Sequence, residues 1–264
     1  MTSESWAVAA PQTLDLGGVS AASLRLQDGR ADVVVDPAAT RTTLEIVEVG
    51  KKPLQVVHEG GRLRVAYERS RVEAFVARVK SLGDSDRAVV RLTVPPGVSV
   101  DVGTTEADVD VAGTTGTVVK TVTGAIRTSG THGSLYLRSV SGDVAASGHA
   151  GDVSAHVVSG ALAVDGALGR VSAGTVSGAV AVTATGTAPM VTAKTVSGDV
   201  ALRLDPGTPV SLKVRGAAGQ VVLDGEVQAS AARTLSVDRS AAGEGSVAYL
   251  TANVTSARVI VSRA

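Results

Sequence analysis

The chain has 264 residues, and its 25 lysines and arginines are balanced by 25 aspartates and glutamates, so no net charge attracts nucleic acid or anionic lipid. Aromatic residues make up 2% of the sequence, which argues against base-stacking platforms and against aromatic-lined pockets for small molecules. Cysteine is absent, which excludes disulfide bonds and thiolate metal sites.

The first residues of the chain predict neither export nor membrane insertion. They read Met-Thr-Ser-Glu-Ser-Trp and lack the basic start and the long apolar core of a secretory signal. No segment reaches the roughly 18 consecutive apolar residues of a membrane span. We therefore expect a cytoplasmic protein whose residues 1–20 form a mobile N-terminal arm, with Trp6 as its bulky side chain.

Residues 21–104 are predicted to be an irregular β-structured part. Short alternating runs, such as Leu24 and Leu26, indicate strands, and the segments 54–57 and 63–66 flank a Gly-Gly turn typical of a hairpin. These strands lack the regular spacing found further along the chain. We expect them to cap the regular part and to cover its otherwise bare edge.

A short basic segment at residues 70–82 departs from this strand pattern. Its apolar side chains stand three and four residues apart, which is helical spacing; they are Val72, Phe75, Val76 and Val79. A basic amphipathic helix can dock on a membrane or in the groove of a partner. The simpler interpretation is that the apolar stripe packs back on the sheet, and both readings stay open.

Residues 105–204 are dominated by a repeat with a step of nine residues. Glycines recur at this step from Gly124 to Gly178, and every second one lies in a phrase such as Val-Ser-Gly-Asp-Val. The residues two and four positions after each glycine are apolar or small, and those between them are polar or small, which indicates a strand. Nine residues thus form one short strand and one corner, where glycine supplies the backbone freedom.

This period predicts an all-β fold, a parallel two-sheet β-solenoid with less regular β caps at both ends. Two nine-residue halves form one coil, and coils stack at about 4.8 Å. We expect right-handed coils. We also expect Val158, Val176 and Val180 to be buried and stacked.

Residues 205–264 are predicted to form a C-terminal β cap. The segments 210–214 and 220–223 read as a closing hairpin, and residues 231–245 read as a polar loop. The stretch Thr255-Ser256-Ala257-Arg258-Val259 resembles a degraded repeat phrase, with alanine where glycine stood. We interpret it as the terminal coil.

The iterated phrase, with the lead-in Val-Arg-Leu-Thr-Val-Pro-Pro-Gly-Val-Ser-Val from Val90, resembles a bacterial β-strand-repeat family described as putative adhesins. The resemblance covers roughly residues 20 to 264. It implies a β-solenoid fold in a domain of unknown function. It transfers no catalytic residue to this chain.

Three kinds of chemical site are disfavoured by the pattern. Calcium-binding nine-residue rolls carry two glycines and an aspartate per turn, whereas this repeat has one glycine and irregular aspartates. His132, His149 and His156 lie in the repeat, where His132 and His149 fall on neighbouring coils, one position out of register and without a third ligand. We therefore expect exposed corner histidines and no zinc site. Asp143 and Asp199 share a coil position but lie three coils apart, about 14 Å, too far for acid–base work.

The remaining polar side chains also predict no reaction. No nucleophile lies in a pattern with a base, and no phosphate-binding loop is present, so we expect no catalytic residue, no cofactor, no metal and no enzyme. A basic column recurs four residues before the phrase glycines, at Lys120, Arg138, His156 and Lys194. Without aromatic residues between the charges, it reads as a solvated edge.

The outward positions that follow the phrase glycines carry mostly alanine. These candidate interaction residues are Ala145, Ala161, Ala163, Ala179, Ala181 and Ala201. Solvated sheet faces usually carry long charged side chains, so a smooth alanine patch indicates close contact, either with residues 231–245 or the N-terminal arm, or with a second molecule. We predict a non-catalytic protein-interaction or scaffold module that self-associates or binds a protein partner. The alternative is an adhesin-like surface protein exported by another route.

Overall fold

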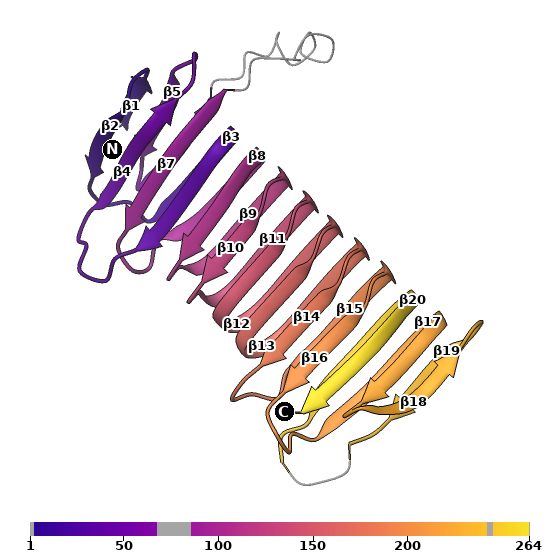
Figure 1. Cartoon of the computed structure of the whole chain (residues 1–264). Helices are drawn as coiled ribbons and strands as arrows, with labels where there is room; N and C mark the ends of the chain where they lie inside the picture. Colours follow the sequence, from indigo (N-terminus) through magenta and orange to yellow (C-terminus); the bar gives the residue numbers. More distant parts are fainter. Residues whose placement is uncertain (1–2, 68–85, 242–244, 264) are drawn as a thin grey trace, which may run out of the picture. The chain divides into compact units, whose positions relative to one another are not determined.

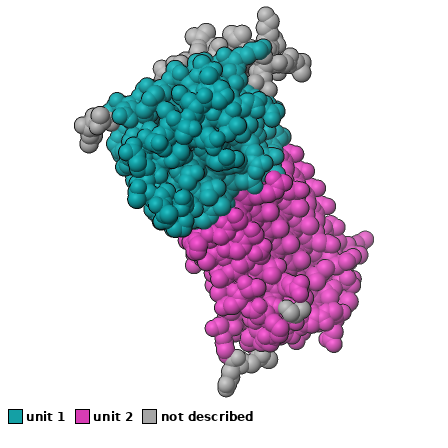
Figure 2. Space-filling view, turned by 60° about the vertical axis from the view of Figure 1, so that its left-hand side comes forward, with its two compact units in different colours: residues 1–125 teal, residues 126–264 magenta. Residues whose placement is uncertain are grey.

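The computed structural model describes residues 3–67, 86–241 and 245–263, which form strands, turns and connections with no helix among them (Figure 1). It divides into two compact units, residues 1–125 and residues 126–264 (Figure 2). The division falls inside the stretch 105–204 that was predicted as solenoid. The all-β prediction is confirmed.

The second unit is a stack of parallel coils with two sheets. Sheet I contains the segments that follow the phrase glycines, and sheet II contains the intervening segments; β12, β13, β17 and β20 turn a corner and contribute to both. In chain order its strands are β10 (Ile126–Ser129), β11 (His132–Ser141), β12 (Val144–Ser159), β13 (Leu162–Ser177), β14 (Val180–Ala184), β15 (Met190–Ser197), β16 (Val200–Leu204), β17 (Val210–Leu223), β18 (Glu226–Ala231), β19 (Leu235–Arg239) and β20 (Ala248–Arg263).

The core between the two sheets is thin and aliphatic. In sheet I, Val144, Leu162 and Val180 occupy successive coils in register and are buried. In sheet II, Leu137 and Ala155 do the same. These are the positions two and four residues after the glycines, so the predicted parallel two-sheet solenoid is confirmed.

One part of the predicted core is wrong. Val180 is 1% exposed, as expected, but Val158 is 45% exposed and Val176 is 49% exposed. In each repeat phrase the buried residue is the one directly before the phrase valine. Val157 is buried before Val158, and Thr175 is buried before Val176. Since side chains alternate along a strand, the phrase valine must point outward.

At three of the phrase glycines, the corner leaves no room for a side chain. Gly160, Gly178 and Gly198 have φ of 141°, 143° and 146°. A Cβ built on Gly178 would lie 2.0 Å from the carbonyl oxygen of Gly160 in the neighbouring coil. Both the dihedral and the close backbone approach therefore require glycine.

The C-terminal cap differs from the predicted hairpin. Residues 210–223 form the single strand β17, which pairs in parallel with β20, and β20 pairs on its other side with β15 and β16. The degraded phrase is thus not the terminal coil, because it lies between the fifth repeat and β17. Antiparallel β18 and β19 pair with β17 and cap sheets I and II, so part of the predicted 231–245 loop is strand.

The first unit has a related plan. Its strands are β1 (Ser3–Val8), β2 (Gln12–Leu16), β3 (Ala21–Val35), β4 (Thr42–Val49), β5 (Leu54–Glu59), β6 (Arg62–Tyr67), β7 (Arg87–Val94), β8 (Ser99–Ala112) and β9 (Thr115–Thr123). Parallel β3 lies between β8 on one side and β6 and β7 on the other. β5 pairs antiparallel with β6, as the predicted hairpin of 54–57 and 63–66 required, and β4 pairs antiparallel with β7.

The predicted N-terminal arm is instead a pair of ordered edge strands. All six residues of β1 pair antiparallel with β5, and all five of β2 pair with β4. Val8 and Leu16 are buried at the ends of these strands. Short edge strands of this kind end a sheet without offering a long surface for further pairing.

Candidate functional site

The six predicted interaction residues lie together on the outer side of sheet I, and we call them the alanine face. They are Ala145, Ala161, Ala163, Ala179, Ala181 and Ala201. Four of them stand in one column, as the register of β12, β13, β14 and β16 places them side by side. Five are exposed and Ala201 is half-buried, so no described segment of the second unit covers the face.

The described strands from the two segments that were expected to cover the alanine face pair with other strands. β19, from the predicted loop, pairs edge to edge with β17 in sheet II. The predicted arm is β1 and β2, which pair within the first unit. In the described part of the second unit, the alanine face is therefore an outer surface.

Larger side chains continue the alanine column at both ends. Arg127 pairs with Ala145 at one end. At the other end, Ala201 pairs with Ile260, and Ile260 pairs with Val222. Sequence reasoning missed this continuation because β20 was placed at the end of the stack, although its apolar alternation from Ala257 onward carried the signal.

Charged residues flank the column on both sides. Asp165 pairs with Thr183, and Thr183 pairs with Arg203, so the acid and the base stand one strand either side of β14. Arg258 directly precedes Val259, the first residue of β20 that pairs with β16 in sheet I. Within the described ranges, the side chains of Arg203 and Arg258 have no hydrogen bond or ion pair, and both residues are exposed.

The aspartates of the repeat connect neighbouring coils. Asp143 Oδ1 accepts a hydrogen bond of 2.9 Å from the backbone N–H of Ala161, one coil away. Asp199 Oδ1 accepts one of 3.0 Å from the N–H of Arg258. These carboxylates satisfy backbone donors at the corners, and the three-coil separation predicted for them is confirmed by the register.

Asp152 combines a similar corner bond with a weak ion pair. Its Oδ1 accepts a 2.8 Å hydrogen bond from the Arg170 N–H, and its Oδ2 lies 3.9 Å from the Arg170 guanidinium. Both side chains are largely exposed, so the ion pair adds little stability. None of these carboxylates lies in an arrangement for proton transfer.

Sheet II presents a different outer surface, with an exposed valine column. The column consists of Val140, Val158, Val176 and Val196. Beside it run Arg138, His156 and Lys194, with Gly174 interrupting the charges. A Cβ on Gly174 would lie 2.8 Å from the His156 ring, so the imidazole occupies that space. Desolvation, and then the charges of Arg138 and Lys194, lower the pKa of His156.

His149 corrects the prediction of exposed corner histidines. His132 and His156 are exposed, but His149 is 0% exposed. Its Nδ1 lies 2.9 Å from the Thr131 hydroxyl, and burial lowers its pKa. The described residues contain no group of three histidine, aspartate and glutamate side chains placed to hold a metal ion.

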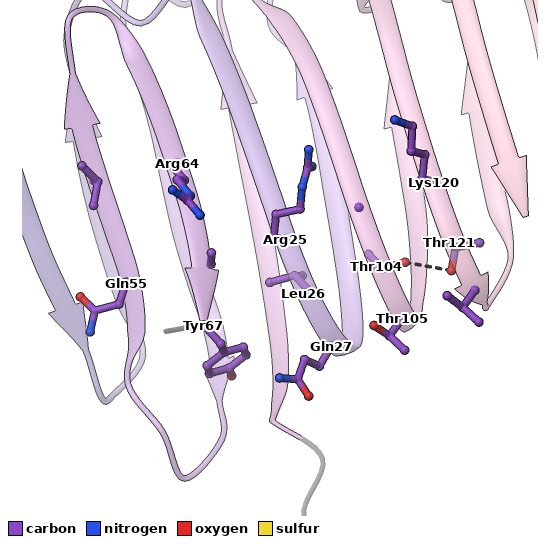
Figure 3. A pocket seen from close by; sticks show the side chains of 14 residues that line it. Arg25, Leu26, Gln27, Gln55, Arg64, Tyr67, Thr104, Thr105, Lys120 and Thr121 are labelled. Carbon is purple, nitrogen blue, oxygen red and sulfur yellow. Dashed lines mark hydrogen bonds between the residues drawn. The ribbon is translucent and has the colours of Figure 1, made fainter. Parts of the chain in front are cut away.

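A shallow groove of about 790 Å³ lies on the outer face of the first unit (Figure 3). Ala66 and Gly103 lie either side of Arg25 in register and leave room for it. Arg25 forms a 2.5 Å ion pair with Asp101. The described lining residues include Arg64 and Tyr67 but no carboxylate.

The candidate docking helix lies outside the described residues. Its apolar side chains, Val72, Phe75, Val76 and Val79, fall within 68–85, so its docking role stays a prediction. In the part of the chain that is described, no membrane-spanning helix is found.

A family model described as Toastrack DUF4097 matches residues 21–254. A search of curated proteins gives no match. The stretch 21–254 includes the five repeat phrases, all of β3 and the first part of β20.

Several matching solved structures come from bacteria. A putative adhesin from Bacteroides fragilis has 11% identity and a TM-score of 0.43, covering 96% of this chain and 97% of its own. A putative lipid binding protein from Parabacteroides distasonis has 12% identity and a TM-score of 0.41, covering 98% of each chain. A putative adhesin from Parabacteroides merdae has 10% identity and a TM-score of 0.40, covering 96% and 95%. At these scores the similarities support no conclusion about function.

Proposed function

Because the chain belongs to the Toastrack DUF4097 family, for which no function is assigned, we propose a role from its own surface: a non-catalytic protein-interaction module that docks a protein through the alanine face. The observation that carries this proposal is the set of exposed alanines on sheet I with unpaired arginines beside it. A surface of this kind offers both apolar contact and charges that remain available to a partner.

The physical case rests on what docking would cost. Alanine has no side-chain rotamers to lose, so covering the alanine face orders no flexible side chain. Sheet II would cost more, because its outer surface carries Arg138, His156 and Lys194. A flat protein surface therefore binds more favourably on sheet I than on sheet II.

Photo-crosslinking from each sheet tests this proposal. A photoreactive phenylalanine analogue at position 163 lies in the alanine column, whereas the same group at position 190 replaces the exposed Met190 of sheet II. In the native host we expect protein adducts from position 163 and few from position 190.

Two results would contradict the proposal. One is a folded variant that gives no protein adduct from position 163. The other is an equal yield of the same adducts from both positions, which would indicate non-specific collision. Thermal melting of both variants confirms beforehand that each analogue is accommodated.

A further inference from the structure

In the second unit, the parallel strands of sheet I form seven successive levels, and antiparallel β18 follows β17 at the C-terminal end. Their central residues, from β10 to β17, are Arg127, Ala145, Ala163, Ala181, Ala201, Ile260 and Val222. Ala181 is the fourth of these seven parallel levels and thus their centre. Its position allows the two halves of the surface to be compared level by level.

Opposite charges stand at matching distances on either side of Ala181. Asp165 lies one level before it and Arg203 one level after it, at the same position along their strands. Asp143 lies two levels before it and Arg258 two levels after it. The two residues have the same position along their strands, because Asp143 directly precedes the buried Val144 and Arg258 directly precedes the buried Val259. One half of the surface thus complements the other half.

We propose that the occupant of the alanine face is a second copy of this chain, related by a twofold axis that runs along the strands through Ala181. This proposal rests on the proposed function and names its partner. The axis reverses the order of the levels and keeps the position along each strand. It therefore sets Asp165 opposite Arg203, and Asp143 opposite Arg258, and each pair occurs twice.

The uncharged positions and the remaining charges also agree with this symmetry. Ala145 faces Ile260, a small side chain against a large one, and Ala181 faces its own copy. Arg127 faces Val222, and Asp199 faces Ala161. No like charges of sheet I are opposed among the described residues of the second unit.

The size of the surface predicts a weak dimer. Seven levels at about 4.8 Å and five residues at about 3.3 Å give roughly 550 Å² per copy. A standard stable interface buries about 800 Å² per partner. We therefore expect association at micromolar concentration or above, weakened by salt because the charge pairs lie at the rim.

Two charge-reversal variants test the dimer: each should weaken self-association, and mixing the two should restore association. In the full chain, Arg203→Glu opposes Glu to Asp165, and Asp165→Arg opposes Arg to Arg203, so each variant alone should dimerise at least tenfold more weakly than the wild type. An equimolar mixture regains both attractive pairs and should form mixed dimers. Sedimentation velocity over a concentration series measures this, with Arg138→Glu on sheet II as the unaffected control.

A second pair of variants keeps the test decisive if Asp165→Arg does not fold. Asp165 accepts a hydrogen bond from the Gly148 N–H, so Asp165→Arg could lower stability. Asp143→Arg with Arg258→Glu repeats the test, and the bond made by Asp143 is dispensable because Ala161 and Ala179 fill the same position in other coils. Thermal melts select the folded pair.

The outcomes separate this inference from the proposed function. Wild-type protein that stays monomeric up to millimolar concentration, or folded variants whose mixture does not associate, overturns the second copy as partner. Adducts from position 163 at the mass of two chains support it. Adducts with other proteins only would retain the docking surface and reject the dimer.

Discussion

His149 places an ionisable ring where water does not reach. Its Nδ1 contacts the Thr131 hydroxyl, and its buried Nε2 has no hydrogen-bond partner among the described residues. Burial therefore favours the neutral ring, and the pKa of His149 lies below its ordinary value. The residue was expected at an exposed corner because its spacing from His132 is close to one coil, and spacing alone does not say which side of a corner is inside.

This buried ring predicts a pH-dependent stability. The unfolded chain binds a proton at His149 near pH 6.5, whereas the folded chain does so only at lower pH. Stability from this residue is present above about pH 6.5 and is lost as the pH falls toward the lower folded pKa. The His149→Gln variant removes the titration and keeps a side chain that can bond Thr131.

Chemical denaturation at several pH values between 7.5 and 5.5 measures this effect. The unfolding free energy of the wild type should fall more over this range than that of His149→Gln. Every other ionisable residue is the same in both proteins, so the contribution of those residues cancels in the difference. Parallel curves for the two proteins would show that His149 is not the cause.

At the scale of strands, the alternation of side chains decides what each position of the repeat phrase does. The end of β13 and the start of β14 are joined by the Gly178 corner, so Val176 and Val180 are close in sequence but lie on different sides. Val176 points outward and Val180 points into the core. The same substitution at these two valines should therefore have opposite consequences.

A matched pair of substitutions tests the strand register. Val180→Asp buries an unpaired carboxylate and should cost about 4 kcal/mol or more. Val176→Asp exposes the same group to water and should cost about 1 kcal/mol. Thermal or urea unfolding of both variants compares them directly, and a larger loss for Val176→Asp would reverse the assigned faces.

The sequence predicted the repeat well for a physical reason. Period-two alternation and glycine at fixed steps leave few other structures, so the parallel coils, the thin core and the alanine column follow from residues such as Val144, Ala163 and Gly178. The inward set was extended wrongly to Val158 and Val176, because a valine was taken as buried without counting its parity from the preceding corner.

Strand order at the ends of the units lies beyond such patterns. Nothing local in the degraded phrase distinguishes a last coil from an inserted one, since the difference lies in which strands pair with β20. Likewise, β1 and β2 each bury a single apolar residue, Val8 and Leu16, which is too weak a pattern to identify a strand. Edge strands gain their stability from the sheet that they join.

At the scale of the whole molecule, the net charge is zero, so the positions of individual charged residues determine which surfaces can bind a partner. The chain has equal numbers of acidic and basic residues, yet on the outer surface of sheet I Asp165 lies one level before Ala181 and Arg203 one level after it. A net charge of zero therefore does not prevent the surface from binding a charged partner.

Location in the cytoplasm stays a prediction, which fractionation of the native host would check.

Removal of β20 tests the inserted order of the C-terminal cap. A chain ending at residue 247 lacks Leu250, Val259 and Val261, each buried between neighbouring coils. At about 1.5–3 kcal/mol per buried side chain, their loss approaches the 5–15 kcal/mol stability of a typical domain. We expect the second unit to lose cooperative unfolding by circular dichroism, whereas loss of a merely terminal coil would leave a sharp transition.

The inserted position of β20 also sets the timing of assembly during synthesis. The ribosome releases β17, β18 and β19 before β20, so these three strands emerge before the parallel neighbour of β17 exists. Until then the open edges of β15 and β16 are free to pair with the wrong strand. The C-terminal end of the second unit is therefore completed late, when β20 pairs with its neighbours on both sides. If the ribosome stalls before residue 248, both β17 and the pair β15 and β16 lack the strand that they bind in the folded chain.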